Sequence, residues 1–197
     1  MTDGTVRVFE VDFDVSEDHF QTLLIDGDDD FSRPWFSLIS SPNSVWQQWR
    51  PPPLYADRPT RPRPDFVLLW GGLGPVLAAT VPQDLRDLLA ISGELLPVDV
   101  EGERLSYLHV TEVLNVLDRD ASVWEGGAAR VLEFHAHRFY EVPLFRIPEN
   151  NSAQVFCLEG FGEFQFKTMV EERGLTGLRF VEAWNSVVGG IRKEPRW

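Results

Sequence analysis

Residues 162–184 read GEFQFKTMVEERGLTGLRFVEAW and place a helical pattern directly before a strand pattern. Phe166, Met169 and Val170 recur at helical spacing, which predicts a helix over 162–173. Gly174 is the residue type that most often follows the end of a helix. After a turn at Thr176 and Gly177, residues 178–184 are predicted to form a strand. This part of the chain therefore combines one helix with one strand of a sheet.

The remaining elements extend this mixture without a regular alternation. A second helix is expected over 81–91, with Thr80 as its N-cap and Pro82 in its first turn. Strands are expected over 67–70, 95–100, 130–134, 139–147 and 154–158. Residues 107–117 indicate a strand at their start and a helix or turn at their end. The predicted class is α+β, a mixed and largely antiparallel sheet with a few packed helices.

The N-terminal region has its own character. In residues 5–15, Val11, Phe13 and Val15 alternate with acidic residues, which predicts a half-buried strand with an acidic outer face. Residues 50–64 are rich in proline and arginine and are expected to form an extended surface connection. Residues 1–63 are therefore an acidic strand region with a proline-rich connection, and 64–197 an α+β domain. Two lobes and one compact unit both remain open.

Composition excludes several classes of protein. The chain has 197 residues, a single cysteine and a formal net charge of −13. A nucleic-acid binder is expected to show a basic face instead. The single thiol of Cys157 cannot form an internal disulfide, which favours the cytoplasm, and its apolar neighbours indicate a buried thiol. We expect no secretion signal or membrane span, because the N-terminus lacks an apolar segment and no apolar run reaches about 18 residues.

The negative charge is concentrated near the N-terminus. Residues 1–32 hold ten acidic side chains and one basic one. Such a field can steer a basic partner, or the carboxylates can form a solvated face that serves solubility, and both interpretations can hold together. The run Asp26 to Asp30 is not a calcium loop, because Phe31 and Ser37 stand where glycine and a bidentate glutamate are needed.

Few residues suggest catalysis. His135 and His137 on a strand would point to the same side and supply two nitrogen ligands to zinc, with Glu133 or His109 as a third ligand. The alternative is that they are polar residues at the exposed end of a strand. The segment that contains glycines 71, 72 and 74 lacks the lysine that a phosphate-binding loop requires. No catalytic residue, metal ligand or cofactor is assigned.

Seven tryptophans are the remaining unusual feature. Trp46 and Trp49 lie three residues apart and would share one aromatic face on a helical turn. They either pack in a core or anchor a partner. Two charged residues in apolar surroundings, Asp118 and Arg146, carry a further prediction: at least one is partly buried and paired, with Asp118 capping backbone donors in a turn.

A series of short segments over residues 64–184 points to a family. They are Pro64-Asp65-Phe66, Leu88-Leu89, Leu96-Pro97-Val98, Tyr107-Leu108-His109-Val110, Val116-Leu117-Asp118 with Asp120 and Ser122, Leu144-Phe145-Arg146-Ile147, and Gly174-Leu175-Thr176-Gly177-Leu178-Arg179-Phe180. In this order they resemble immunity family eleven, bacterial immunity proteins of polymorphic toxin systems. His109 stands where asparagine is expected. The resemblance implies neutralisation of a cognate toxin and supplies no catalytic residues.

The expected function is therefore toxin neutralisation by occlusion, without catalysis, of a partner encoded by a neighbouring gene. The alternatives are a metal-dependent hydrolase that uses His135 and His137, and a regulatory interaction module without a toxin partner. Neither nucleic acid nor membrane is an expected partner, and the oligomeric state is open. The candidate partner-binding residues are Asp12, Asp14, Glu17, Asp18, Asp26, Asp28, Asp29, Asp30, Trp46 and Trp49.

Overall fold

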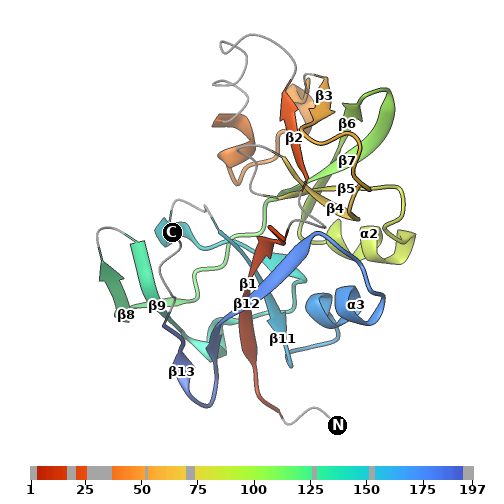
Figure 1. Ribbon diagram of the computed structural model, residues 1–197. Helices are drawn as coiled ribbons and strands as arrows, with labels where there is room; N and C mark the ends of the chain where they lie inside the picture. Colours follow the sequence, from red (N-terminus) through yellow and green to blue (C-terminus); the bar gives the residue numbers. More distant parts are fainter. Residues whose placement is uncertain are drawn as a thin grey trace.

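The computed structural model describes residues 4–16, 21–25, 37–51, 53–69, 74–125, 128–150 and 154–192. A five-stranded sheet lies beside a closed six-stranded barrel, and a two-stranded hairpin flanks the sheet (Figure 1). Short helices accompany these strands. The predicted α+β class, with mixed and antiparallel strand pairing, is confirmed.

The five-stranded sheet is antiparallel throughout. Its order is β10 (Leu144–Phe145), β11 (Val155–Glu159), β1 (Arg7–Phe13), β12 (Leu178–Asn185) and β13 (Gly189–Gly190). The predicted strands over 154–158 and 178–184 correspond to β11 and β12. The strand expected over 139–147 is reduced to the two residues of β10.

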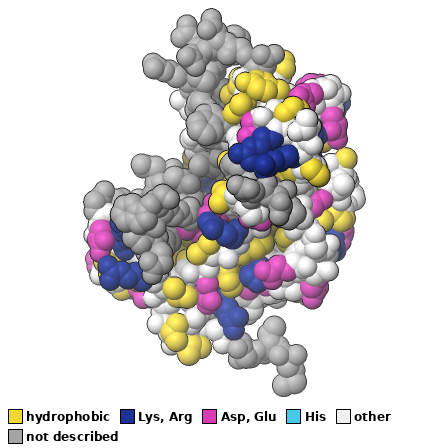
Figure 2. Space-filling view, in the orientation of Figure 1, with side chains coloured by type: hydrophobic (Ala, Val, Ile, Leu, Met, Phe, Trp, Pro, Cys, Tyr) yellow, Lys and Arg dark blue, Asp and Glu magenta, His cyan; other side chains and the backbone are white. Residues whose placement is uncertain are grey.

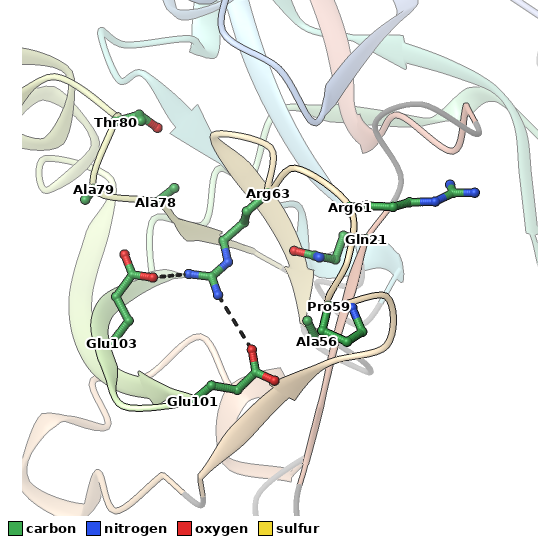
Figure 3. Close-up of a pocket in the computed structure, with 10 residues that line it drawn as sticks. All are labelled: Gln21, Ala56, Pro59, Arg61, Arg63, Ala78, Ala79, Thr80, Glu101 and Glu103. Atoms are coloured by element: carbon green, nitrogen blue, oxygen red, sulfur yellow. Dashed lines mark hydrogen bonds and ion pairs between the residues drawn. The ribbon is translucent and has the colours of Figure 1, made fainter.

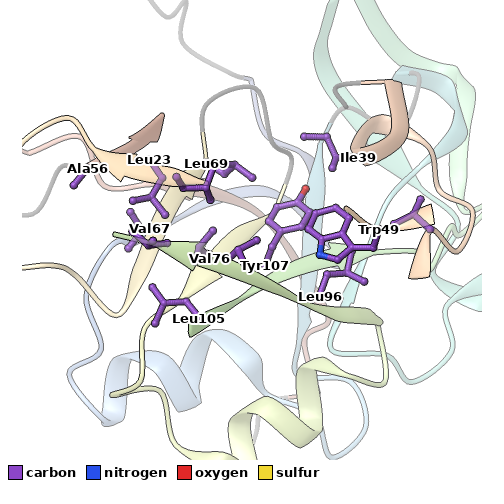
Figure 4. Packing of buried hydrophobic residues seen from close by; sticks show 14 residues of the cluster. Leu23, Ile39, Trp49, Ala56, Val67, Leu69, Val76, Leu96, Leu105 and Tyr107 are labelled. Carbon is purple, nitrogen blue, oxygen red and sulfur yellow. The ribbon is translucent and has the colours of Figure 1, made fainter. Parts of the chain in front are cut away.

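The barrel closes through two parallel strand pairs. Its order is β2 (Thr22–Ile25), β3 (Leu54–Ala56), β6 (Gly93–Val100), β7 (Glu103–Val110), β5 (Pro75–Leu77) and β4 (Phe66–Leu69), with β2 returning beside β4. The pairs β3/β6 and β2/β4 are parallel, and the other neighbours are antiparallel. Branched side chains and two aromatic rings fill the interior (Figure 4).

The hairpin and the short helices complete the chain. The hairpin is formed by β8 (Leu117–Glu125) and β9 (Ala128–Phe134). The helices α2 (Gln83–Leu89) and α3 (Phe166–Glu172) have seven residues each. The described residues also form the 3₁₀ turns η1 (Trp46–Gln48), η2 (Ala136–Arg138) and η3 (Pro148–Asn150). Residues 37–40 are also helical.

The end of α3 follows the local sequence closely. Gly174 has a φ of 61° and lies just beyond the last helical turn. The N–H of Leu175 donates to the carbonyl oxygen of Val170, and that of Gly174 donates to the carbonyl oxygen of Glu171, which satisfies two of the free carbonyls of the last turn. Leu175 and Val170 also pack in the same apolar cluster. The predicted stop at Gly174 is confirmed.

The start of α2 differs from the prediction. Pro82 is the N-cap residue and makes no side-chain capping bond. The hydroxyl of Thr80 donates instead to Asp65 Oδ1, at the start of β4. Thr80 is therefore not the helix cap, because a distant carboxylate competes successfully for its hydroxyl.

The strand β1 was expected to be half-buried with an acidic outer face, and this is wrong for its first half. It lies in the middle of the sheet, where both faces are covered: Val8 packs in one apolar cluster and Phe9 in another. Glu10 is only 4% exposed, and its Oε1 accepts a hydrogen bond from Gln154 Nε2 at 2.7 Å. The central position of β1 in the sheet therefore decides which of its side chains are buried, and the alternation of apolar and acidic residues does not.

The proline-rich stretch also departs from its prediction, because β3 lies within it. Leu54 and Ala56 are buried, and β3 pairs with both β2 and β6. Residues 1–63 thus supply β1 to the sheet and two strands to the barrel. In both the sheet and the barrel, these strands pair with strands from residues 64–197. A third apolar cluster joins the barrel strands, the sheet, α2 and α3.

Candidate functional site

The 3₁₀ turn η1 holds one tryptophan in solvent and buries the other. The Trp46 side chain is 57% exposed, whereas Trp49 is 5% exposed and packs inside the barrel. The indole of Trp49 stacks on Tyr107 with ring centroids 5.8 Å apart and an interplanar angle of 6° (Figure 4). Its Nε1 donates to the carbonyl oxygen of Pro97 at 2.6 Å.

The two indoles do not share a face, because the chain changes conformation between them. Trp49 terminates the turn with extended dihedrals, φ −65° and ψ 112°, which direct its side chain into the barrel. On the other side of the turn, the N–H of Val45 donates to Glu94 Oε2 at 2.9 Å. Trp46 is therefore presented on a turn that is fixed at both ends.

Two of the predicted acidic residues make contacts within the protein. Asp12 Oδ2 lies 2.6 Å from Arg179 Nη2 on the neighbouring β12, and Asp14 Oδ1 accepts a hydrogen bond from the N–H of Ser16. Figure 2 shows acidic and basic side chains interspersed over the sheet that contains β1 and β12. The other predicted carboxylates, Glu17, Asp18, Asp26, Asp28, Asp29 and Asp30, lie outside the described residues.

A pocket of about 260 Å³ lies at one end of the barrel, where sequence analysis assigned no site (Figure 3). Its walls come from Gln21, from the connection between β3 and β4, from residues 78–80 after β5 and from the β6–β7 turn. Arg63 lies in the middle of the view with Glu101 and Glu103 beside its guanidinium. Gln21 precedes β2 and Arg63 lies in the proline-rich stretch, and neither belongs to a sequence pattern that would have identified this pocket.

Charged groups at the pocket are largely matched. Arg63 Nη1 is hydrogen-bonded to Glu103 Oε2, and Nη2 lies 3.9 Å from Glu101 Oε2. Arg86 fixes the wall after β5, since its guanidinium donates to the carbonyl oxygens of Ala78 and Val81. Burial lowers the pKa of Arg86 from its ordinary value.

The histidine pair follows the end of β9 instead of lying on the strand, which agrees with the alternative interpretation of polar residues at the exposed end of a strand. His135 precedes η2 and His137 lies within it, with ring centroids 5.6 Å apart. Glu133 accepts hydrogen bonds from Trp184 Nε1 and from the N–H of Gly190, while His109 is buried and contacts Ser41 and Glu94. Over the residues whose structure is described, no three histidine, cysteine, aspartate or glutamate side chains are arranged to hold a metal ion.

Three further sequence predictions are confirmed. Cys157 is fully buried, and burial raises the pKa of its thiol well above the ordinary value. Arg146 is also fully buried and donates to the carbonyl oxygens of Ser40, Ser41 and Val110. Asp118 Oδ1 accepts a hydrogen bond from the N–H of Ala121 at 3.1 Å, the predicted capping contact.

No model of a known protein family matches this sequence, and no curated protein is significantly similar to it. The resemblance to immunity family eleven therefore rests on the order of the short segments quoted above. No helix in the described ranges is long and apolar enough to cross a membrane.

Proposed function

We propose that this protein is a cytoplasmic binding protein that neutralises a cognate bacterial toxin by covering it, without chemistry of its own. The order of the segments between residues 64 and 184 supports the comparison with immunity proteins. The observation that carries the proposal is the exposed Trp46 on a turn fixed at both ends.

An exposed tryptophan offers a partner a large apolar surface. Tryptophan is enriched among the residues that dominate binding energy at protein interfaces. Because η1 is held by Val45 on one side and Trp49 on the other, little backbone freedom is lost when Trp46 is covered. Gln47 and Gln48 beside it are exposed and supply polar groups for the rim of an interface.

Net charge supplies the second part of the proposal. At −13, the protein attracts a basic partner over distance, which raises the association rate more than the affinity. If the toxin is a nuclease, its substrate-binding face is basic and an acidic protein competes there as a polyanion. The acidic run at 26–30 is the densest source of this charge in the sequence.

The test uses the toxin domain encoded by the neighbouring gene. Purified protein is expected to bind this domain and to abolish its toxicity when both are co-expressed. Trp46→Ala should weaken binding by roughly 30-fold or more, the effect of losing a dominant interface residue. Tyr140→Ala is the matched control, since Tyr140 is another exposed aromatic residue, 51% accessible, at a different place in the fold. Equal affinities for the wild type and Trp46→Ala would exclude η1 from the interface.

The charge contribution is tested separately. Replacing Asp28, Asp29 and Asp30 by asparagine should lower the association rate and its dependence on salt, with a smaller effect on dissociation. An association rate at low salt that does not change would refute steering and leave the contribution of Trp46 in place.

A further inference from the structure

The pocket at the barrel end contains a buried hydrogen-bonding atom that the protein does not use. Gln21 is 3% exposed and lines the pocket. Its Nε2 donates to the carbonyl oxygen of Arg58 at 3.0 Å, which fixes the orientation of the amide. Its Oε1 has no hydrogen-bond partner within the described part of the chain. Figure 3 shows this oxygen turned toward the guanidinium of Arg63.

Arg63 supplies the complementary group. Its terminal nitrogens are held by Glu101 and Glu103, but its Nε has no partner among the described residues. Gln21 and Arg63 thus line the same pocket, and each has one buried polar atom, an acceptor oxygen and a donor N–H, without a partner in the described residues. Buried polar groups in folded proteins are almost always hydrogen-bonded, so each unsatisfied group needs an explanation.

Volume and charge restrict what can fill the space. The pocket of about 260 Å³ is several times the roughly 30 Å³ that one water molecule occupies in the liquid. The lining includes two arginines, Arg61 and Arg63, and two glutamates, Glu101 and Glu103, so its formal charges balance. The pocket therefore favours an uncharged molecule. Ala56, Pro59, Ala78 and Ala79 contribute small apolar walls suited to a flat group.

We propose that this pocket binds an uncharged small molecule through an amide edge, an N–H group next to a carbonyl. The N–H of the ligand donates to Gln21 Oε1, and its carbonyl oxygen accepts from Arg63 Nε. Two sources offer this chemistry: a primary carboxamide and a cyclic amide such as a pyrimidine ring. This site is independent of the proposed toxin interface, because it uses neither Trp46 nor the acidic run.

The experiment is a titration followed by amide chemical shifts, with three probes. Propanamide represents the carboxamide source, uracil represents the cyclic source, and 1,3-dimethyluracil keeps the ring and carbonyls but lacks both N–H groups. We expect saturable shifts at the barrel end with propanamide or uracil, and whichever binds more tightly identifies the source. Dimethyluracil should bind at least about tenfold more weakly than uracil, because Oε1 then finds no donor.

Gln21→Met tests the assigned contact. Methionine preserves the length of the side chain and removes the acceptor, so affinity should fall by about tenfold. Gln83→Met makes the same replacement at an exposed position of α2 and should leave affinity unchanged. Thermal unfolding without ligand shows whether each variant remains folded, and Arg63→Lys, which keeps the charge but loses Nε, provides a second variant.

Three outcomes would overturn the proposal. The first is the absence of saturable shifts with either amide probe, which would mean that the pocket holds water only. The second is equal affinity for uracil and 1,3-dimethyluracil. The third is unchanged ligand affinity in both Gln21→Met and Arg63→Lys.

Discussion

The five-stranded sheet and the barrel bury polar groups in different ways. In the sheet, Glu10 Oε1 accepts a hydrogen bond from Gln154, and Glu159 accepts three from the first turn of α3 at Lys167 and Thr168. At the barrel end, the buried Gln21 Oε1 and Arg63 Nε lack partners within the described residues. Buried polar groups that are satisfied stabilise a fold, whereas unsatisfied ones cost free energy until something binds them. The hydrogen-bonded carboxylates of Glu10 and Glu159 thus stabilise the sheet, while the unsatisfied groups at the barrel end can gain free energy when a ligand binds.

The largest expected effect tests whether the two regions unfold together. Trp49→Ala removes the stack on Tyr107 and the bond to Pro97, so the free energy of unfolding should fall by about 3–5 kcal/mol. The apolar cluster shared by barrel, sheet and helices should keep unfolding as one transition. Urea denaturation followed by fluorescence and circular dichroism measures both quantities.

Trp46→Ala is the control for this experiment. The exposed indole should cost no more than about 0.5 kcal/mol. Two separated transitions in either protein would mean that the barrel and the sheet are independent units.

The next prediction compares the two kinds of buried polar group directly. Glu159→Met leaves the N–H groups of Lys167 and Thr168 without their acceptor and should cost about 1–3 kcal/mol. Gln21→Met removes an oxygen that has no partner in the described structure and loses only the bond to Arg58, so its cost should stay below about 1 kcal/mol. Chemical denaturation of both variants checks the order. The reverse order would remove the distinction between scaffold and binding site.

A smaller effect concerns the contact between the start of β4 and the turn before β12. Burial by itself raises the pKa of Asp65, but hydrogen bonds from Thr80 and Thr176 outweigh it, and the pKa lies below its ordinary value of 3.8. The stabilisation is therefore fully present above pH 3.8 and is lost as the pH falls through the lower folded value. Asp65→Asn should lower the thermal midpoint at neutral pH.

The pH dependence separates charge from shape in this variant. The difference between Asp65→Asn and the wild type should shrink below pH 3.8, where the wild-type carboxyl becomes protonated. A difference in thermal midpoint that is the same at pH 3 and pH 7 would contradict the assignment.

The smallest effect is expected at the contact between α2 and α3. Asp84 receives two hydrogen bonds from the Arg173 guanidinium, and these lower the pKa of its carboxyl. Because both groups lie at the surface, solvent and salt screen their attraction. Asp84→Asn should change the thermal midpoint slightly at low salt and not at all at high salt. An effect that persists in high salt would indicate a role beyond charge.

Local signals in the sequence predicted the elements that local forces form. Gly174 was expected to end a helix because glycine adopts a positive φ at little cost, and no distant contact is needed for that preference. The strands at 154–158 and 178–184 followed from their apolar patterns for the same reason. Thr80 was assigned wrongly, since its hydroxyl bonds to Asp65, which is close only after the barrel forms.

The sequence also left open which tryptophan would be exposed. Trp46 and Trp49 are the same residue type in neighbouring positions, and only the extended dihedrals of Trp49 turn one indole into the barrel. The pocket at the barrel end had no sequence signal at all, because Gln21 and Arg63 are separated by more than forty positions and meet through barrel closure.

By itself, the sequence determined the α+β class, the strong negative charge, the buried thiol of Cys157 and the stop of α3. These depend on composition and on residues that are neighbours along the chain. The tertiary structure alone decided that β1 lies in the middle of the sheet, that Glu10 is buried and that β3 joins the barrel. The physical reason is that a strand's two faces and two edges are assigned by its partners, which lie far away in sequence and become neighbours only when the chain folds.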